Sequence, residues 1–175
     1  MTDVLSSRPE DMDPPSERRG PPDEATLELI ELLFFAYRDF VADADALLVR
    51  YGFGRAHHRV LHFVSRNPGL KVADLLTILK ITKQSLGRVL RDLVEQEFIE
   101  AREGQEDRRQ RLLCLTPKGT ALTRDLTRLQ ARRISGALAS MDTGTGQTVA
   151  AFLTAMIDAD AREDVMQLVS GSGGL

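Results

Sequence analysis

Residues 82–91 carry a group of side chains that could bind nucleic acid. The polar positions on one side of this segment are all able to donate hydrogen bonds, and they are Thr82, Lys83, Gln84, Ser85, Arg88 and Arg91. Lysine and arginine pair with phosphate oxygens and with guanine, and glutamine pairs with adenine. Asp92 is the one acid in the first three turns of the helix expected here. A solvated face usually mixes both signs, so this pattern favours contact with duplex DNA.

A second basic group lies in the polar loop of residues 102–111, where Asp107 directly precedes Arg108 and Arg109. An arginine at the tip of a protruding loop suits the minor groove, because narrow A·T tracts concentrate negative potential there. A carboxylate beside two arginines would weaken phosphate binding unless it orients Arg109 through a hydrogen-bonded pair. On charge alone, this orienting role and a surface salt bridge in a flexible loop explain the residues equally well.

The charge of the chain is distributed unevenly along the sequence. The whole chain carries −3, but residues 50–118 contain 14 Lys/Arg and 8 Asp/Glu, a net charge of +6, and the remaining residues carry −9. A basic middle between acidic flanks is expected when one part of a chain faces phosphate. Chance clustering of solvated charge is the alternative.

The elements that must position these groups follow from the apolar pattern. A helix is expected over residues 82–96, with Thr82 able to cap its start. Its inner face is formed by Leu86, Val89, Leu90, Leu93 and Val94. A short helix over residues 72–79 precedes it across a brief turn, and an earlier helix stops at residues 67–69. Two short helices joined by a tight turn can place the second in the major groove.

Strands are expected on both sides of the polar loop, over residues 98–102 and 111–116. Thr116 and Pro117 then resemble an N-cap and a first helical residue, so a long helix should follow to about residue 140. A last helix is expected over about residues 147–169. Near the other end of the sequence, a helix over residues 24–49 carries two apolar stripes, which indicates burial on more than one side. A second copy of the chain is the simplest partner for such long amphipathic helices.

The predicted fold is mainly α: a winged helix-turn-helix with a two-stranded β wing over residues 51–117, and long dimerisation helices over 24–50 and 118–170. Residues 1–23 contain five prolines among many charges and are expected to be a disordered tail. No signal peptide and no run of 18 apolar residues is apparent, which predicts a cytoplasmic protein without a membrane partner. The single cysteine, Cys114, excludes an internal disulfide.

The wing resembles that of the MarR family of winged helix-turn-helix transcription regulators. Asp107-Arg108-Arg109, followed by the apolar strand and by Thr116-Pro117-Lys118-Gly119, is similar to the family's wing and the start of its next helix. Residues 81–86 are similar to the start of its recognition helix, and the likeness covers about residues 53–119. It implies a homodimer with interlocked terminal helices that acts as a repressor or activator on a pseudopalindromic operator, often under a small-molecule or redox effector.

Three histidines near the start of the helix before residues 67–69 invite a further interpretation. His58 and His62 have the i, i+4 spacing that can hold a metal or haem iron. No Cys, Asp or Glu nearby in sequence completes such a site, so no metal or cofactor is expected. Effectors of the MarR family lodge between the first helix, the second helix and the helix after the wing. By that analogy, the candidate effector pocket consists of Phe34, Tyr37, Arg38, His57, His58 and His62.

Other function classes receive less support from the sequence. No Gly-rich phosphate loop, metal-spaced acid cluster or nucleophile elbow occurs, so no enzyme is expected. One alternative is a winged-helix module that binds protein instead of DNA. Another is a regulator that senses haem or redox state, the latter through Cys114. Leu113 and Leu115 should face the core, and Cys114 should face away from it with Leu112; a lone cysteine without a resolving partner is more often inert.

Overall fold

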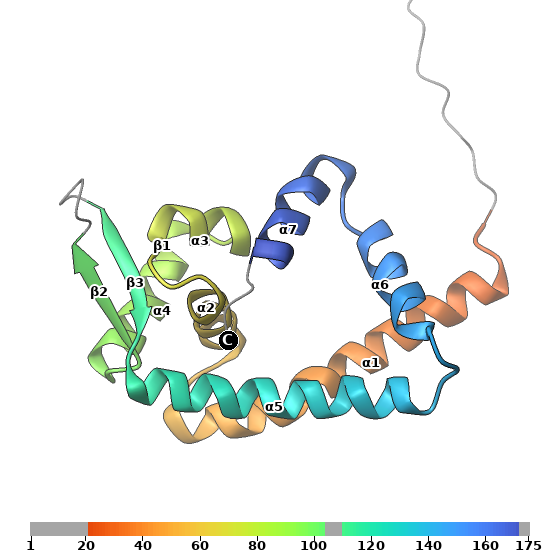
Figure 1. Cartoon of the computed structure of the whole chain (residues 1–175), viewed down its shortest axis with the longest axis horizontal. Coiled ribbons are helices and arrows are strands. Elements are labelled where there is room, and N and C mark those ends of the chain that lie inside the picture. The colour runs from red at the N-terminus through yellow and green to blue at the C-terminus, as the bar shows by residue number, and fades with distance from the viewer. Residues whose placement is uncertain (1–20, 104–109, 172–175) are drawn as a thin grey trace, which may run out of the picture. The chain divides into compact units, whose positions relative to one another are not determined.

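The computed structural model describes residues 21–103 and 110–171 (Figure 1). The chain divides into two compact units, residues 1–36 and 37–175, and the boundary falls within helix α1 (Glu24–Leu48). In the N-terminal unit the structure describes the first half of α1, and its apolar side chains are exposed, among them Leu29 and Phe34. The predicted tail lies mostly outside the described residues and stays a prediction.

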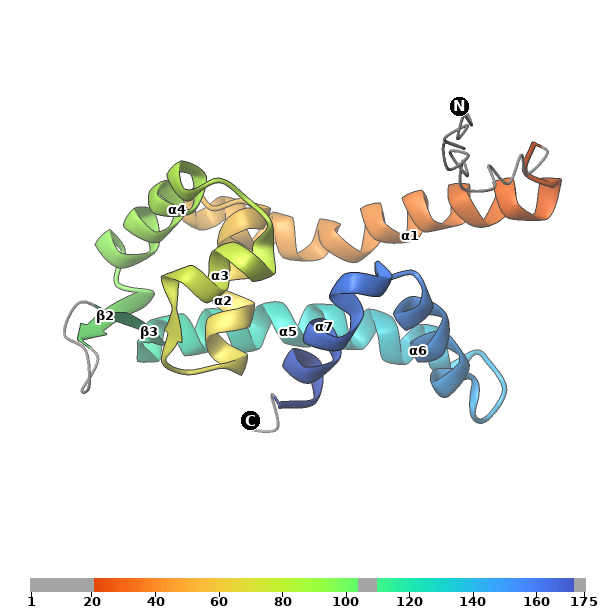
Figure 2. The same cartoon turned by 90° about the horizontal axis from the view of Figure 1, so that it is seen from above.

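The second unit contains the remaining elements (Figures 1 and 2). After α1 and a 3-10 turn they are α2 (Arg55–Arg66), β1 (Leu70–Lys71), α3 (Val72–Leu79), α4 (Lys83–Glu95), β2 (Ile99–Glu103), β3 (Arg111–Leu115), α5 (Pro117–Ala139), α6 (Thr145–Ala155) and α7 (Ala159–Gly171). The expected order of three helices, a hairpin and a long helix is confirmed. None of the described helices is both long and apolar enough to cross a membrane.

The sheet has three antiparallel strands in the order β1-β3-β2, one more than the two-stranded wing expected from the sequence. The added strand pairs Leu70 with Leu113, and the Gly69 N–H donates to the Leu113 carbonyl at 2.9 Å. Gly69 has a φ of 87°, a value that favours glycine, and it turns the chain into this pairing. Two residues are too few to show strand alternation, so the sequence pattern could not reveal β1.

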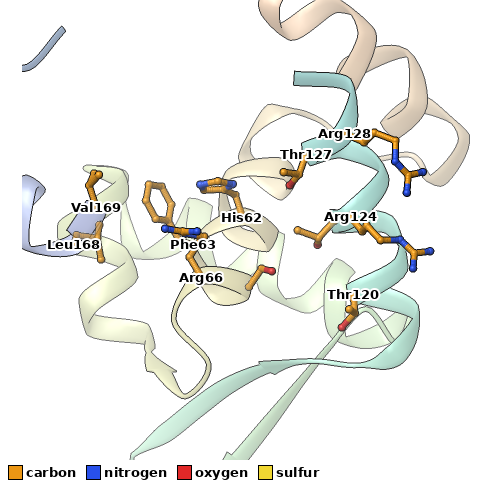
Figure 3. A pocket seen from close by; sticks show the side chains of 11 residues that line it. His62, Phe63, Arg66, Thr120, Arg124, Thr127, Arg128, Leu168 and Val169 are labelled. Atoms are coloured by element: carbon orange, nitrogen blue, oxygen red, sulfur yellow. The ribbon is translucent and has the colours of Figure 1, made fainter. Parts of the chain in front are cut away.

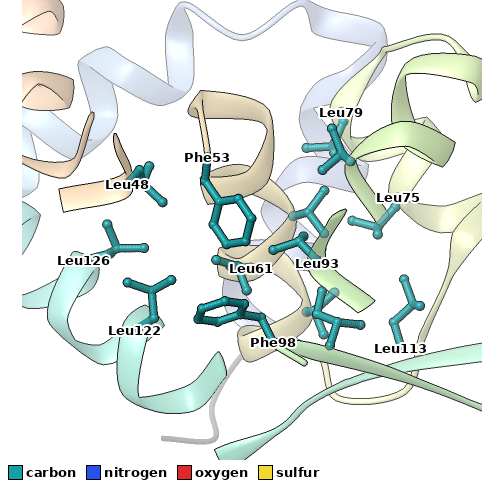
Figure 4. Packing of buried hydrophobic residues seen from close by; sticks show 14 of the residues in the cluster. Leu48, Phe53, Leu61, Leu75, Leu79, Leu93, Phe98, Leu113, Leu122 and Leu126 are labelled. Carbon is teal, nitrogen blue, oxygen red and sulfur yellow. The ribbon is translucent and has the colours of Figure 1, made fainter. Parts of the chain in front are cut away.

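The hydrophobic core fills the space between α2, α3, α4, α5, the sheet and the end of α1 (Figure 4). Phe98 is 1% exposed and makes edge contacts with the rings of Tyr51 and Phe53. The core also fixes α4, since Leu86, Val89 and Leu93 are buried in it. Val94 was expected on the same face but is 42% exposed. It lies about 100° further around the helix than Leu93, which turns it out of the core.

The single helix expected over residues 147–169 is wrong, because the structure has two helices separated by residues 156–158. The carbonyls at the end of α6 need hydrogen-bond donors. Arg162 supplies them, donating to the Thr154, Ala155 and Ile157 oxygens at 3.1, 3.2 and 2.9 Å. Neither glycine nor proline marks this break, so the apolar periodicity continued across it without a signal.

Candidate nucleic-acid interface

The start of α4 is fixed by a side-chain cap. The Thr82 hydroxyl accepts a hydrogen bond from the Ser85 backbone N–H at 3.1 Å and donates to the Ser85 hydroxyl at 2.9 Å. Lys80, in the turn before it, has a φ of 50° and closes α3 by donating its N–H to the Leu76 carbonyl. The predicted cap and tight turn are therefore both present. Together they join α3 and α4 as a helix-turn-helix.

The outer face of α4 is exposed along its length. It carries the residues that the sequence singled out for DNA contact, Lys83, Gln84, Ser85, Arg88 and Arg91. Between described residues, the side chains of Lys83, Gln84, Arg88 and Arg91 make no hydrogen bond or ion pair within the chain. These donors therefore do not stabilise the fold through such contacts, and they lie on the side of α4 opposite the buried face that holds the helix.

The far end of α4 is held by contacts that the sequence did not reveal. Lys118, the second residue of α5, donates from Nζ to the Gln96 carbonyl at 2.8 Å, and its ammonium lies 4.4 Å from the centre of the Phe98 ring. Gln96 in turn donates from its amide to the Tyr51 carbonyl at 3.3 Å. A cation near a helix C-terminus is favourable because the last carbonyls carry partial negative charge. These contacts restrict movement of α4 relative to the core.

The tip of the wing lies outside the described residues, and with it Asp107, Arg108 and Arg109. The orienting role of Asp107 therefore stays a prediction. Within the described part of the hairpin, Glu103 pairs with Arg111 in register, and their side chains form an ion pair at 3.3 Å. Arg102 pairs with Glu100 on the same strand. Charged side chains thus line the end of the described hairpin that leads to the tip of the wing.

The structure brings together three of the six residues proposed for an effector pocket. Tyr37, His58 and His62 line a cavity of about 320 Å³ between the second half of α1, α2 and α5. Phe34 lies in the N-terminal unit and is 69% exposed. Arg38 forms an ion pair with Asp39 at 2.8 Å and does not line the cavity. His57 does not line it either, because its ring is engaged with α4.

The two histidines of this cavity favour the neutral form. Burial lowers the pKa of His58, and neighbouring His62 lowers it further, while Asp45 acts weakly in the opposite direction. Burial also lowers the pKa of His62, with a smaller contribution from Arg66. A neutral imidazole can both donate and accept a hydrogen bond, so the two histidines add polar groups to the cavity. Its positive charge comes from Arg55 and Arg59, which also line it.

A larger cavity of about 580 Å³ lies between α2, α5 and α7 and shares His62 and Phe63 with the first (Figure 3). Thr123 lines it, is 4% exposed, and has a buried hydroxyl without a hydrogen-bond partner among the described residues. Figure 3 shows the guanidinium groups of Arg124 and Arg128 pointing away from α2. Sequence reasoning missed this cavity because it did not separate α7 from α6.

The part of the chain that the structure describes offers few side chains for metal binding or redox chemistry. Within residues 21–103 and 110–171 no three His, Cys, Asp or Glu side chains are grouped so that they could hold a metal ion. Cys114 is half-buried and lies opposite Glu100 in the sheet, while Leu113 faces the core as expected. Redox sensing through Cys114 stays the alternative given above.

The helix-turn-helix and the antiparallel wing that follows it define a winged helix-turn-helix protein. A MarR family model matches residues 51–110. The HTH-type transcriptional regulator PetP of Rhodobacter capsulatus is 44% identical over 149 residues, which are 83% of this chain and 88% of the relative. The chain therefore belongs to the MarR family. It is a MarR-type transcriptional regulator and not an enzyme, as expected.

Solved structures share this fold at lower sequence identity. A MarR transcriptional regulator from Methanosarcina mazei Go1 is 23% identical, covers 77% of this chain and 94% of its own, and has a TM-score of 0.60. FabT of Streptococcus pneumoniae, solved in complex with DNA, is 18% identical, covers 80% of this chain and 99% of its own, and has a TM-score of 0.65. These comparisons confirm the mainly α winged fold.

Proposed function

We propose that the chain binds a pseudopalindromic DNA operator as a homodimer, with α4 of each subunit in a major groove and each wing at a flanking minor groove. The outer face of α4 carries this proposal, because its basic and amide side chains are exposed and not engaged with other described residues. The fold shared with FabT, which was solved with DNA, supports it. Matching B-DNA requires the two recognition helices to lie roughly 34 Å apart.

Exposed apolar surface supports the homodimer. In the N-terminal unit, Leu29 and Phe34 are 56% and 69% exposed, and in α6, Phe152 and Leu153 are 50% and 52% exposed. Large apolar side chains exposed in groups along a helix favour an interaction site. A second copy of the chain covers like surfaces with like surfaces, since a twofold interface uses the same patch on both subunits.

The cavity lined by Tyr37, His58 and His62 supports response to a small-molecule effector. A largely apolar cavity with a few convergent polar groups suits an aromatic or anionic ligand. This cavity lies between α1, which we assign to the dimer, and α2, which belongs to the DNA-binding domain. A ligand in it would therefore change the spacing between the winged helix-turn-helix domains of the two subunits. A small change of spacing weakens contacts at both half-sites at once.

Selection of bound DNA from a random duplex pool tests the proposed operator. The enriched site should be an imperfect palindrome, and its affinity should fall steeply with salt because phosphate contacts release counterions. Lys83→Ala combined with Arg88→Ala should lose most of this binding. Arg132→Ala, which removes an exposed arginine of α5, is the matched control and should bind normally once its oligomeric state is checked. Binding without sequence enrichment, or retained binding in the double variant, would overturn the proposal.

A further inference from the structure

A polar link joins the start of α2 to the middle of α4. The Nε2 atom of His57 lies 3.1 Å from the Oδ2 atom of Asp92. Between described residues, this is the one hydrogen bond from a side chain of α4 to a side chain of another helix. It ties the helix that carries Gln84 and Arg88 directly to its neighbour.

The imidazole of His57 is held on three sides. Its Nδ1 atom accepts the Gly54 backbone N–H at 3.1 Å, so Nε2 carries the ring proton and donates it to Asp92. The ring stacks on Phe53 with 4.6 Å between centroids and 10° between planes, and its side chain is 13% exposed. Phe53 is itself part of the core. A donor fixed in this way determines where its acceptor lies.

The acceptor occupies a sensitive position on α4. Asp92 follows Arg91 directly and lies one turn after Arg88, the i, i+4 spacing at which opposite charges pair along a helix. If Asp92 were released, its carboxylate could pair with Arg88 and withdraw that guanidinium from DNA. The bond to His57 instead keeps the carboxylate toward α2.

We propose that His57 is a positioning residue for DNA recognition: through Asp92 it fixes the rotation of α4 about its axis and keeps Arg88 available to the groove. This inference rests on the proposed function, because it assigns a role within the same DNA interface. It also separates His57 from the effector cavity, where the family analogy placed it.

A double-mutant cycle measured on the intact chain tests the link. The variants are His57→Ala, Asp92→Ala and the pair together, and the quantities are affinity for the selected operator and the ratio of that affinity to the affinity for single-base variants. His57→Ala should lower operator affinity about tenfold and reduce the ratio, because it also frees the Asp92 carboxylate to pair with Arg88. Asp92→Ala removes that carboxylate, so it should reduce the ratio with a smaller loss of affinity. The pair should lose no more than His57→Ala alone, because both changes break one interaction.

Two further variants separate positioning from general stability. Asp92→Asn keeps an oxygen that accepts from His57 Nε2 and should recover most of the affinity and the base preference. Glu95→Ala removes an exposed acid from the same helix and should leave base preference unchanged. Circular dichroism melts identify any variant that fails to fold, and the Asp92→Asn and Glu95→Ala pair still decides the question in that case.

The outcomes distinguish this inference from the function on which it rests. Additive losses, or an Asp92→Ala variant that binds all duplexes more tightly with preference intact, would show that Asp92 merely repels phosphate. If the unaltered chain prefers its operator and both single variants have the same affinity and the same base preference, the positioning role alone would be overturned. A chain that binds no duplex at all would overturn the proposed function and this inference together.

Discussion

At the scale of single residues, Gly119 shows how closely the wing packs on α5. A Cβ added at this position would lie 2.0 Å from the Phe98 carbonyl oxygen. Gly119→Ala should therefore lower the free energy of unfolding by about 2–3 kcal/mol, as other overpacked sites do. Gly136→Ala, in the last turn of the same helix with open space around it, should raise it by up to about 0.5–1 kcal/mol. Urea denaturation of both variants measures the difference, and equal stabilities would contradict the close approach.

The lowered pKa values of buried His58 and half-buried His62 predict that stability depends on pH. Because the pKa values of His58 and His62 are lowered in the folded chain from 6.5, the unfolded chain binds protons more readily. Stability should therefore be full above about pH 7 and should fall as the pH drops through 6.5. Thermal melts at pH 7.5 and 5.5 measure this loss. His58→Gln should reduce the loss, and an unchanged pH dependence in that variant would exclude His58 as its source.

The outer face of α4 allows base contacts to be separated from phosphate contacts. Gln84→Ala or Arg88→Ala should relax preference at specific symmetric positions of the operator, since a bidentate base contact is worth about 1–3 kcal/mol. Arg91→Ala should weaken binding to all sequences and reduce the salt slope by about one. Titration against single-base variants at two salt concentrations measures both effects. If Gln84 and Arg88 variants lose affinity uniformly, specificity must come from the wing or from DNA shape.

At the scale of elements, the wing provides its own test. Arg109→Ala should weaken binding to every duplex, most of all to operators with A·T-rich flanks, because those minor grooves are narrow. Asp107→Ala should do similar harm although it removes a negative charge near DNA, since Arg109 would lose its orienting partner. Anisotropy titrations with A·T-rich and G·C-rich flanks compare the two variants. Tighter binding by Asp107→Ala would favour simple repulsion instead.

The elements also show which features the sequence could predict. Helix α3 begins and ends where it was expected, and the boundaries of α4 and α5 agree within a residue, because caps and apolar spacing are local signals. Strand β1 depends on pairing with β3, which lies far away in the sequence. The break before α7 depends on hydrogen bonds from Arg162, and an arginine does not mark a helix end in the sequence. The contact between His57 and α4 could not be predicted for a similar reason, since its partner Asp92 lies 35 residues away in the sequence.

At the scale of the whole molecule, the proposed binding to a pseudopalindromic operator requires that the chain forms a homodimer. The intact chain should be a homodimer at micromolar concentration, because the exposed apolar side chains of α1 and α6 need a partner. Light scattering measures the mass. Deletion of residues 141–175 should give unstable or aggregating protein, since it removes α6 and α7. A well-folded monomer of the intact chain would contradict the twofold model of operator binding.

Different residues of α4 hold the helix in the fold and face the proposed DNA site. This separation has a consequence for how the target sequence of such a regulator can change in evolution. Leu86, Val89 and Leu93 hold the helix, whereas Lys83, Gln84 and Arg88 take no part in holding it. Exposed substitutions of this kind usually change stability by within about 0.5 kcal/mol. After gene duplication, one copy can therefore acquire a new target sequence through a few neutral steps while its folding and assembly stay intact. Target choice in this lineage can evolve separately from the architecture that presents it.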